Sequence, residues 1–397
     1  MSDKQMAYMC TIKELTPIEN KDRIVLATFE ENNWSVIVQK ELHSIGQKVV
    51  YVETESILPL WPEFQFLEKR CFSAKRKGYV IKRMAMGGVD SEGIVFNLSS
   101  LPNNLWANKS DQALVDMDWT AALQIRRKED IVPQWQPEKK GWLENKISWL
   151  MWKLFRIKQQ RIGNVPSDFP SYLMKTDETQ MQSIPQVFEI MKNRQVAITL
   201  KLDGQSLTFA HHKGVFTIST RNRSVYRNKI KKAISALNMK TSEKFFEKNP
   251  HLYIAAFYEI PRKLKDGLAI QGEFCGPGIQ KNRLGLKHFE FYAFNLFNIS
   301  KRKFYSTQKL KLFCDESNIK MVPFIEVKKF EWNSIKEIEQ YAAPFTYESG
   351  LPAEGLVIRG WQEGAEWMED PYTKMHGSLS MKIISPRYKT KFQDEDE

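Results

Sequence analysis

Five short polar motifs, separated by apolar runs, carry the residues of this sequence that could perform chemistry. In chain order they are Lys-Leu-Asp-Gly at 201–204, Ser-Thr-Arg-Asn at 219–222, Gln-Gly-Glu at 271–273, Glu-Gly-Leu-Val-Ile-Arg at 354–359 and Ser-Met-Lys at 380–382. The lysine motif alone is a weak signal. Together, however, the motifs supply a nucleophile, sugar and phosphate contacts, two carboxylates and a second cation. The set predicts a site for nucleotidyl transfer.

Lys201 is the predicted nucleophile. An ordinary lysine is protonated at neutral pH, and attack on a triphosphate requires the neutral amine, which desolvation or nearby cations favour. The apolar run 195–200 predicts a strand that ends at Lys201, which suits this requirement. Gly204 lets the backbone turn close to a nucleotide, and Asp203 offers a carboxylate to a hydrated cation or to Lys201. The alternative is an exposed lysine before an Asp-Gly turn.

Two further carboxylates and a second cation complete the predicted site. Glu273 and Glu354 each adjoin a glycine at a strand edge, and with Asp203 they form the predicted metal-binding set for Mg²⁺ or Mn²⁺. A metal beside Lys201 would stabilise the developing phosphorane, while Lys382 would neutralise phosphate oxygens in the transition state. Isolated carboxylates of this kind are more often solvated turn residues, so the assignment depends on the whole array.

Residues from about 169 to 391 resemble the nucleotidyltransferase domain of ATP-dependent RNA ligases, in the RNA ligase 2-like branch. The most specific stretches are 271–282 and 291–295. Upstream, Phe-Pro at 169–170 and Lys-Thr-Asp-Glu at 175–178 resemble the subgroup with an N-terminal OB domain, the Naegleria-type RNA ligases. The resemblance implies an α+β protein, in which an OB-like β-barrel precedes a mixed α+β nucleotidyltransferase domain of ATP-grasp-like ligase fold.

The resemblance also implies roles for single residues. Lys201 would attack the α-phosphorus of ATP, Glu273 would bind the ribose and help the metal, and Glu354 would hold metal-bound water. Arg221 matches an arginine that contacts the nucleotide and later the 5′-phosphate strand, a role that suits a guanidinium. Phe294 takes the place of an aromatic residue that stacks on adenine, worth about 1 kcal/mol. Its Phe-Tyr-Ala-Phe alternation fits a core position equally well.

Three positions depart from the family pattern. Leu200 stands where the subgroup often has a glutamate, Gln180 stands where an arginine is usual, and Ser380 stands where some relatives have another lysine. These changes leave the nucleophile intact and alter the expected phosphate contacts. Arg359 is a candidate for one such contact, and the alternative is an exposed strand residue.

Length and patterning predict two domains joined by a linker. Short alternating apolar segments at 1–102 indicate the OB-like β-barrel. Residues 103–168 form a linker rich in tryptophan and basic residues, in which a helical pattern at 141–157 fits packing between domains or contact with a membrane surface. The nucleotidyltransferase domain covers 169–392, and 393–397 is an acidic tail. The expected strands are 23–29, 34–38, 49–52, 195–200, 289–296 and 356–358, and the expected helices are 229–237 and 334–341.

Composition favours a polyanionic partner. The sequence has 59 Lys and Arg against 47 Asp and Glu, a formal charge of +12, and basic residues gather at 221–232 and 387–391, beside the predicted site. Four cysteines without CxxC spacing indicate neither a disulfide framework nor a structural zinc site. We see no signal peptide and no stretch of transmembrane length. We therefore expect a monomeric intracellular protein, cytoplasmic or nuclear.

These observations predict an ATP-dependent RNA ligase that joins RNA 3′-hydroxyl and 5′-phosphate ends, including those of a nicked duplex, in RNA repair. One alternative is a DNA ligase or an mRNA capping guanylyltransferase, which share the lysine chemistry but usually place the OB domain after the transferase. A second alternative is a noncatalytic RNA-binding protein with a decayed transferase domain. The retained lysines and carboxylates argue against the second alternative.

Overall fold

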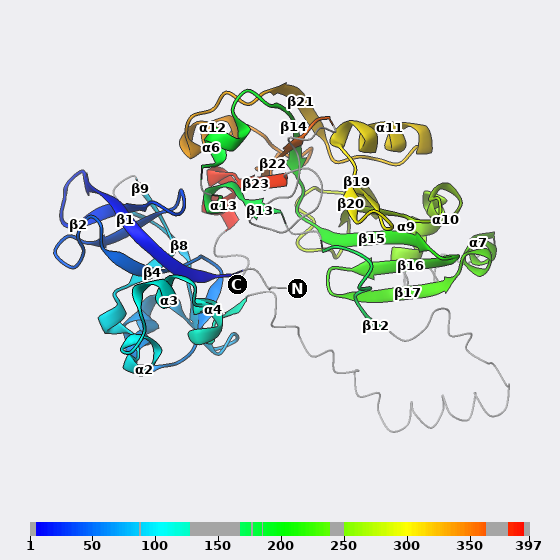
Figure 1. Cartoon of the computed structure of the whole chain (residues 1–397). Helices are drawn as coiled ribbons and strands as arrows, with labels where there is room; N and C mark the ends of the chain where they lie inside the picture. The colour runs from blue at the N-terminus through cyan, green and yellow to red at the C-terminus, as the bar shows by residue number, and fades with distance from the viewer. Residues whose placement is uncertain are drawn as a thin grey trace, which may run out of the picture. The chain divides into compact units, whose positions relative to one another are not determined.

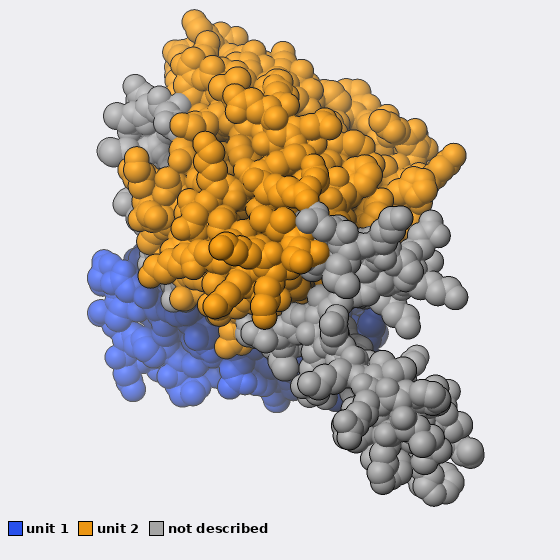
Figure 2. Space-filling view, turned by 90° about the vertical axis from the view of Figure 1, so that its right-hand side faces the viewer, with its two compact units in different colours: residues 1–155, 182–186 blue, residues 156–181, 187–397 orange. Residues whose placement is uncertain are grey.

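The computed structural model of this protein consists of two compact units, coloured separately in Figure 2. Unit 1 comprises Met1–Phe155 together with Gln182–Gln186, and unit 2 comprises Arg156–Met181 together with Val187–Glu397. The predicted linker helix 141–157 and the predicted acidic tail lie outside the described residues. The structure describes residues 5–86, 89–127, 167–175, 178–184, 186–238, 250–362 and 380–392.

Unit 1 is built on a five-stranded antiparallel sheet with the order β10-β4-β1-β2-β3. The long strand β1 pairs with β4 through its first five residues and with β2 from Ile12 onward, with a register shift after Ile12. Such a shift bends a strand and lets one sheet curl toward a barrel. The strands are β1 (Ala7–Ile18), β2 (Lys21–Phe29), β3 (Ser35–Gln39), β4 (Lys48–Val52) and β10 (Ile94–Phe96).

A second sheet of unit 1, with the order β11-β5-β7-β6, is joined by a separate β8–β9 hairpin and by short helices. Phe64 and Trp119, which are completely buried, belong to the core that packs against this sheet. The elements are β5 (Ser56–Leu58), η1 (Pro62–Leu67), α1 (Glu68–Cys71), β6 (Phe72–Ser73), β7 (Gly78–Val80), β8 (Arg83–Met86), β9 (Val89–Glu92), η2 (Leu98–Ser100), α2 (Asn103–Trp106), α3 (Asp111–Val115), α4 (Trp119–Ala122) and β11 (Arg126–Arg127).

A short segment from much later in the chain also belongs to unit 1. The backbone N–H of Asn33 donates to the carbonyl oxygen of Gln182 at 2.8 Å. The indole Nε1 of Trp34 donates to Oγ of Ser183 at 3.0 Å, and that hydroxyl donates to Oε1 of Glu53 at 3.1 Å. The barrel therefore holds this segment through both backbone and side-chain hydrogen bonds.

Unit 2 contains two sheets, one on the right of Figure 1 (β15 to β20) and one in its upper centre (β13, β14 and β21 to β23). The seven-stranded sheet has the order β12-β17-β16-β15-β18-β19-β20, and the five-stranded sheet has the order β13-β23-β22-β14-β21. Their strands are β12 (Ser167–Asp168), β13 (Thr179–Gln180), β14 (Gln195–Lys201), β15 (Gln205–His212), β16 (Val215–Thr220), β17 (Arg223–Lys229), β18 (Leu268–Cys275), β19 (Glu290–Asn298), β20 (Lys303–Phe304), β21 (Phe324–Lys329), β22 (Gly355–Gly360) and β23 (Ser380–Ile384).

Helices α7, α9 and α11 cover one face of the seven-stranded sheet (Figure 1). Phe209, Phe216 and Phe291 from the strands pack with Ile254 of α9 and Leu310 of α11 in one core cluster. These helices therefore bury the apolar face that the alternation of residues along the strands predicts for this sheet. The helices are η3 (Met181–Ser183), α6 (Val187–Met191), α7 (Ile230–Asn238), α9 (Pro250–Phe257), α10 (Ile260–Lys263), α11 (Thr307–Ser317), α12 (Ile335–Ala342) and α13 (Pro386–Phe392).

The expected strands and helices that fall within the described residues are present, with ends that differ by a few residues at most. Helix α12 begins where its local sequence predicts, because Oγ of Ser334 accepts a hydrogen bond from the backbone N–H of Glu337. The Glu337 carboxylate in turn accepts from the backbone N–H of Asn333, a reciprocal cap that fixes a helix start. Within the described residues, no helix has the length and apolar character needed to cross a bilayer.

Candidate active site

The site forms where the chain passes from one sheet of unit 2 to the other. Strand β14 of the five-stranded sheet ends at Lys201, and β15 of the seven-stranded sheet begins at Gln205. Lys201 lies opposite Gly355 on β22, which places the preceding Glu354 next to it. Glu273 enters from β18, where it pairs with Ser206 of β15. Three motifs that are far apart in the sequence are therefore brought to one point by strand pairing.

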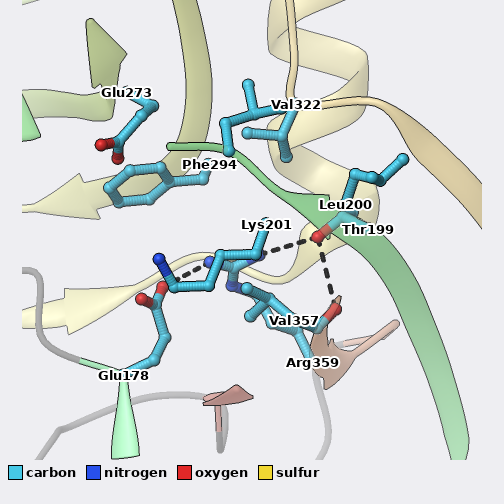
Figure 3. A pocket seen from close by; sticks show the side chains of 10 residues that line it. Glu178, Thr199, Leu200, Lys201, Glu273, Phe294, Val322, Val357 and Arg359 are labelled. Carbon is cyan, nitrogen blue, oxygen red and sulfur yellow. Dashed lines mark hydrogen bonds and ion pairs between the residues drawn. The ribbon is translucent and has the colours of Figure 1, made fainter. Parts of the chain in front are cut away.

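Lys201 is ion-paired inside a small pocket. Its Nζ lies 2.7 Å from Oε1 of Glu354, and the two side chains are only 20% and 18% exposed. Lys201 lines this pocket together with Glu178, Glu273 and Phe294. Figure 3 shows these side chains pointing toward one another around the lysine. The buried, partnered position excludes the alternative of an exposed lysine at a strand end.

The electrostatics of the pocket keep Lys201 charged. Burial alone lowers the pKa of the amine, but the carboxylates of Glu354, Glu273 and Glu178 outweigh it, so the pKa lies above its ordinary value. Burial raises the pKa of Glu273 to about 8, against the opposing effect of Lys201. Burial likewise raises the pKa of Glu354, while the positive charges of Lys201 and Lys382 act against that shift. An excess of carboxyl groups therefore surrounds the Lys201 ammonium, while Lys382 contributes a second positive charge near Glu354.

Such an excess suits a divalent cation that keeps most of its water. Among the described residues, no three carboxylate, imidazole or thiolate side chains converge closely enough to hold a metal ion alone. Mg²⁺ normally uses one or two protein carboxylates and completes its shell with water and phosphate oxygens. Glu273 and Glu354 have the chemistry for that role, and their raised pKa values show that an added positive charge would be favourable there.

Asp203, the third predicted carboxylate, is held by residues that the sequence motifs do not include. Its Oδ2 accepts hydrogen bonds from Nη1 of Arg283 at 2.5 Å and from the hydroxyl of Tyr388 at 3.0 Å. The guanidinium also lies over the ring of Phe392, 4.2 Å from its centroid. Arg283 directly follows the 271–282 stretch, so only proximity to that stretch could have drawn attention to it. Asp203 thus ties the loop after Lys201 to the C-terminal helix α13.

Gly204 and Tyr347 fix the backbone around the nucleophile. A Cβ atom at Gly204 would lie 2.6 Å from the carbonyl oxygen of Phe274 and 2.7 Å from Sγ of Cys275, so only glycine fits against β18. The hydroxyl of Tyr347 donates to the carbonyl oxygen of Lys201 at 3.0 Å and accepts from the backbone N–H of Glu354 at 2.9 Å. This tyrosine, which the sequence did not indicate, bridges the two ion-paired residues.

Arg359 and Glu178 form a buried ion pair at the edge of the pocket. Nη2 of Arg359 donates to Oε1 of Glu178 at 2.5 Å, and Nη1 donates to Oγ1 of Thr199 at 3.2 Å. The guanidinium lies 5.6 Å from the ring centroid of Phe294. The alternative of an exposed strand residue is therefore wrong for Arg359, which is 4% exposed. Glu178 belongs to the 175–178 element that resembles the family, the one signal that could have identified it.

The remaining predicted residues are Phe294, Lys382 and Arg221, and only Phe294 is among the residues that line the pocket. Phe294 belongs to a buried cluster with Leu202 and also lines the pocket. Lys382 lies on β23 opposite Val357 of β22, on the same sheet as Lys201. Arg221 lies in the turn between β16 and β17 and is not among the residues that line the pocket.

Comparison with known proteins identifies both units. Residues 194–370 match the family model described as RNA ligase, and residues 6–98 match a model described as an OB-fold domain. No curated protein sequence matches the chain. Among solved structures, RNA ligase from Naegleria gruberi with PPi is 22% identical, with a TM-score of 0.72 over 99% of this chain and 100% of that chain.

Two further structures of the Naegleria gruberi enzyme are similar to this chain. A variant with ATP and Mn is 21% identical, with a TM-score of 0.72 over 99% of both chains. Another variant, with AMP and Mn, is 21% identical, with a TM-score of 0.73 over 98% of this chain and 100% of that chain. These likenesses confirm the predicted fold class, an OB-fold domain followed by an α+β ligase domain. Residues 194–370 of the chain thus match the RNA ligase family model.

Proposed function

We propose that this protein is an ATP-dependent RNA ligase that joins a 3′-hydroxyl to a 5′-phosphate through a lysine–AMP intermediate on Lys201. The observation that carries the proposal is the short ion pair between Lys201 and Glu354, with Lys201 lining a pocket together with Glu273 and Phe294. A buried amine beside carboxylates and an aromatic ring suits the covalent capture of a nucleotide.

In the first step, the amine of Lys201 attacks the α-phosphorus of ATP. A P–N bond forms, and the P–O bond to pyrophosphate breaks. The ammonium must first lose a proton, because only the neutral amine has a lone pair. A divalent ion, when bound, offsets negative charge on the phosphates and carboxylates. Glu273 and Glu354 would hold that ion through its water, with Asp203 nearby, and Lys382 would neutralise nonbridging oxygens.

In the later steps, AMP passes from Lys201 to the 5′-phosphate of an RNA strand, and the 3′-hydroxyl attacks that phosphate and releases AMP. Arg221 is the proposed contact of the 5′-phosphate strand, since a guanidinium binds phosphate in a bidentate manner. The ATP, AMP and Mn in the similar structures support ATP with Mn²⁺ or Mg²⁺ as cofactors. We further propose that the substrate is a nick in duplex RNA and that the enzyme acts in repair as a monomer.

The decisive experiment is mass spectrometry of the intact protein after incubation with ATP and Mn²⁺. The protein should gain one adenylyl unit, and peptide mapping should place it on Lys201. Lys201→Arg should abolish the adduct, while the matched control Lys213→Arg, at an exposed hairpin turn, should keep it. An adduct on another residue, or none on the native protein, would refute the proposed nucleophile.

Two substitutions of the substrate separate the alternatives. A guanylyltransferase would form the adduct with GTP instead of ATP. A DNA ligase would seal a nick whose 3′-hydroxyl strand is DNA as readily as one whose 3′-hydroxyl strand is RNA. The proposal requires adduct formation with ATP and a preference for the RNA 3′-hydroxyl.

A further inference from the structure

Unit 1 exposes two phenylalanine rings on one short stretch of chain. Phe66, near the end of η1, is 66% exposed, and Phe72, the first residue of β6, is 47% exposed. Among the aromatic residues of unit 1 that the structure describes, these two alone are exposed. Single exposed apolar residues are common on protein surfaces. The surroundings of this pair decide whether it has a function.

Both rings sit on a well-packed support. Phe66 contacts Phe96 edge-on at 6.3 Å between centroids, and Phe72 contacts Tyr79 in the same way at 6.3 Å. Phe64, two residues before Phe66, and Leu67, directly after it, are buried in the core of unit 1. The rings are therefore held in place by buried neighbours while a large part of their surface remains open.

The same stretch is strongly basic. Residues 66–77 contain five cations and a single acid, Glu68. The turn that carries three of the cations is fixed by Arg126, whose Nη2 donates to the carbonyl oxygens of Arg76 at 2.9 Å and Lys77 at 2.7 Å. We define the η1–β7 patch by the six exposed aromatic and basic residues of this stretch, which also exposes Glu68 and Ala74. The six are Phe66, Lys69, Arg70, Phe72, Lys75 and Lys77.

We propose that the η1–β7 patch binds single-stranded RNA. Open aromatic rings stack on unpaired bases, and cations beside them neutralise the phosphates of the same strand. A duplex would not use the rings, because its bases are already stacked on one another. A protein partner fits poorly, because the centres of protein interfaces are depleted of lysine, which is interleaved with the rings here. The inference rests on the proposed ligase function only in taking RNA as the polymer.

The first test is the affinity of the full-length protein for a fluorescein-labelled 16-nucleotide oligouridylate, measured by fluorescence anisotropy without ATP. Replacing both rings, Phe66→Ala with Phe72→Ala, should raise Kd about tenfold, equivalent to about 1.4 kcal/mol. Phe66→Tyr with Phe72→Tyr keeps both rings and should bind as the native protein does. The matched control Phe257→Ala, which removes a ring that is 61% exposed on α9, should not change Kd.

The second test is the salt dependence of the same binding. Lys75→Ala with Lys77→Ala should make the slope of log Kd against log salt shallower by about 1 to 1.5, as expected for two lost phosphate contacts with a single strand. The double alanine variant of the rings should keep the native slope, because it removes no charge. An unchanged slope in the lysine variant would contradict a phosphate-binding role for the turn.

Adenylylation of Lys201, measured on the same preparations, separates failure of this inference from failure of the proposed function. The ring variant should adenylylate normally, since Lys201 lies in unit 2. If it adenylylates normally and binds oligouridylate with native affinity, the η1–β7 patch is overturned and the proposed function stands. An equal loss of affinity for an RNA duplex of the same length would also overturn base stacking. If the native protein forms no adduct, the proposed function fails instead.

Discussion

The amine of Lys201 lies 2.7 Å from Oε1 of Glu354, so the proposed nucleophile is held as an ion pair by the protein itself. The sequence suggested that desolvation would keep this amine neutral. The structure shows the opposite balance, because the nearby carboxylates raise the pKa of Lys201 despite its burial. The carboxylates therefore stabilise the protonated, unreactive form of Lys201. A cation that binds these carboxylates would lower the pKa of the amine and favour its neutral form.

Glu354→Gln should lower the pKa of Lys201, because it removes the carboxylate that stabilises the ammonium form. The measurement is the pH dependence of Lys201 acetylation by acetic anhydride, followed by peptide mapping in the absence of nucleotide. The midpoint should move to lower pH in the variant and stay in place for Glu331→Gln, which changes an exposed carboxylate. A midpoint that did not move would show that Glu354 does not control the amine.

The buried carboxyl of Glu273 should make the protein less stable as the pH rises. Its pKa is raised from 4.5 to about 8 in the folded protein, so between these values the folded state binds a proton more tightly than the unfolded state. This contribution to stability is present below pH 4.5 and is lost as the pH rises through about 8. Urea unfolding at several pH values should show a shallower decline for Glu273→Gln, and an identical decline would contradict the assignment.

Arg283→Ala should destabilise unit 2 by roughly 3–5 kcal/mol, because it leaves the Asp203 carboxylate buried without its charged partner. The side chain of Arg283 is 3% exposed, and that of Asp203 is 11% exposed. Arg262→Ala is the matched control, since its pair with Glu259 is solvated and worth about 1 kcal/mol or less. Urea midpoints measure both changes, and equal midpoints for the two variants would rule out a structural role for the Arg283 pair.

Phe294→Ala should weaken ATP binding about fivefold, the loss expected for one stacking contact of about 1 kcal/mol. Phe294→Tyr keeps the ring and should retain most of the affinity. Equilibrium dialysis with ATP and Mn²⁺, using Lys201→Arg protein to prevent reaction, measures the binding step alone. If the alanine variant bound ATP as well as its parent while remaining folded, Phe294 would be a core residue only.

The sequence predicted well the features that depend on neighbouring residues. The apolar run before Lys201 forms β14, and the helix expected at 334–341 forms α12, since periodicity is a local property. The ordered motifs also predicted that Glu354 and Glu273 would meet Lys201, because each carboxylate stands at a strand edge beside a glycine.

The sequence could not predict partners that only the sheet topology brings together. Arg359 and Glu178 are 181 residues apart in the chain, and Tyr388 is 185 residues from Asp203. No periodicity in the sequence links such positions, because their proximity in space depends on which strands pair with one another. Arg359 consequently looked as much like an exposed strand residue as a site residue. The same reason hid Tyr347, whose hydroxyl reaches the backbone of Lys201 across 146 residues.

The hydrogen bonds that hold Gln182 and Ser183 against Asn33 and Trp34 have a practical consequence for anyone who dissects this enzyme. A ligase fragment that starts at residue 169 would contain Gln182 and Ser183 but lack Asn33 and Trp34, their hydrogen-bond donors. A barrel fragment that stops at residue 127 would lack Gln182 and Ser183. Two-piece reconstitution should therefore work best when the barrel half is supplied with a synthetic 182–186 peptide. A deletion that separates the 182–186 segment from the barrel would misfold the protein, and the resulting loss of activity could be mistaken for a loss of RNA binding.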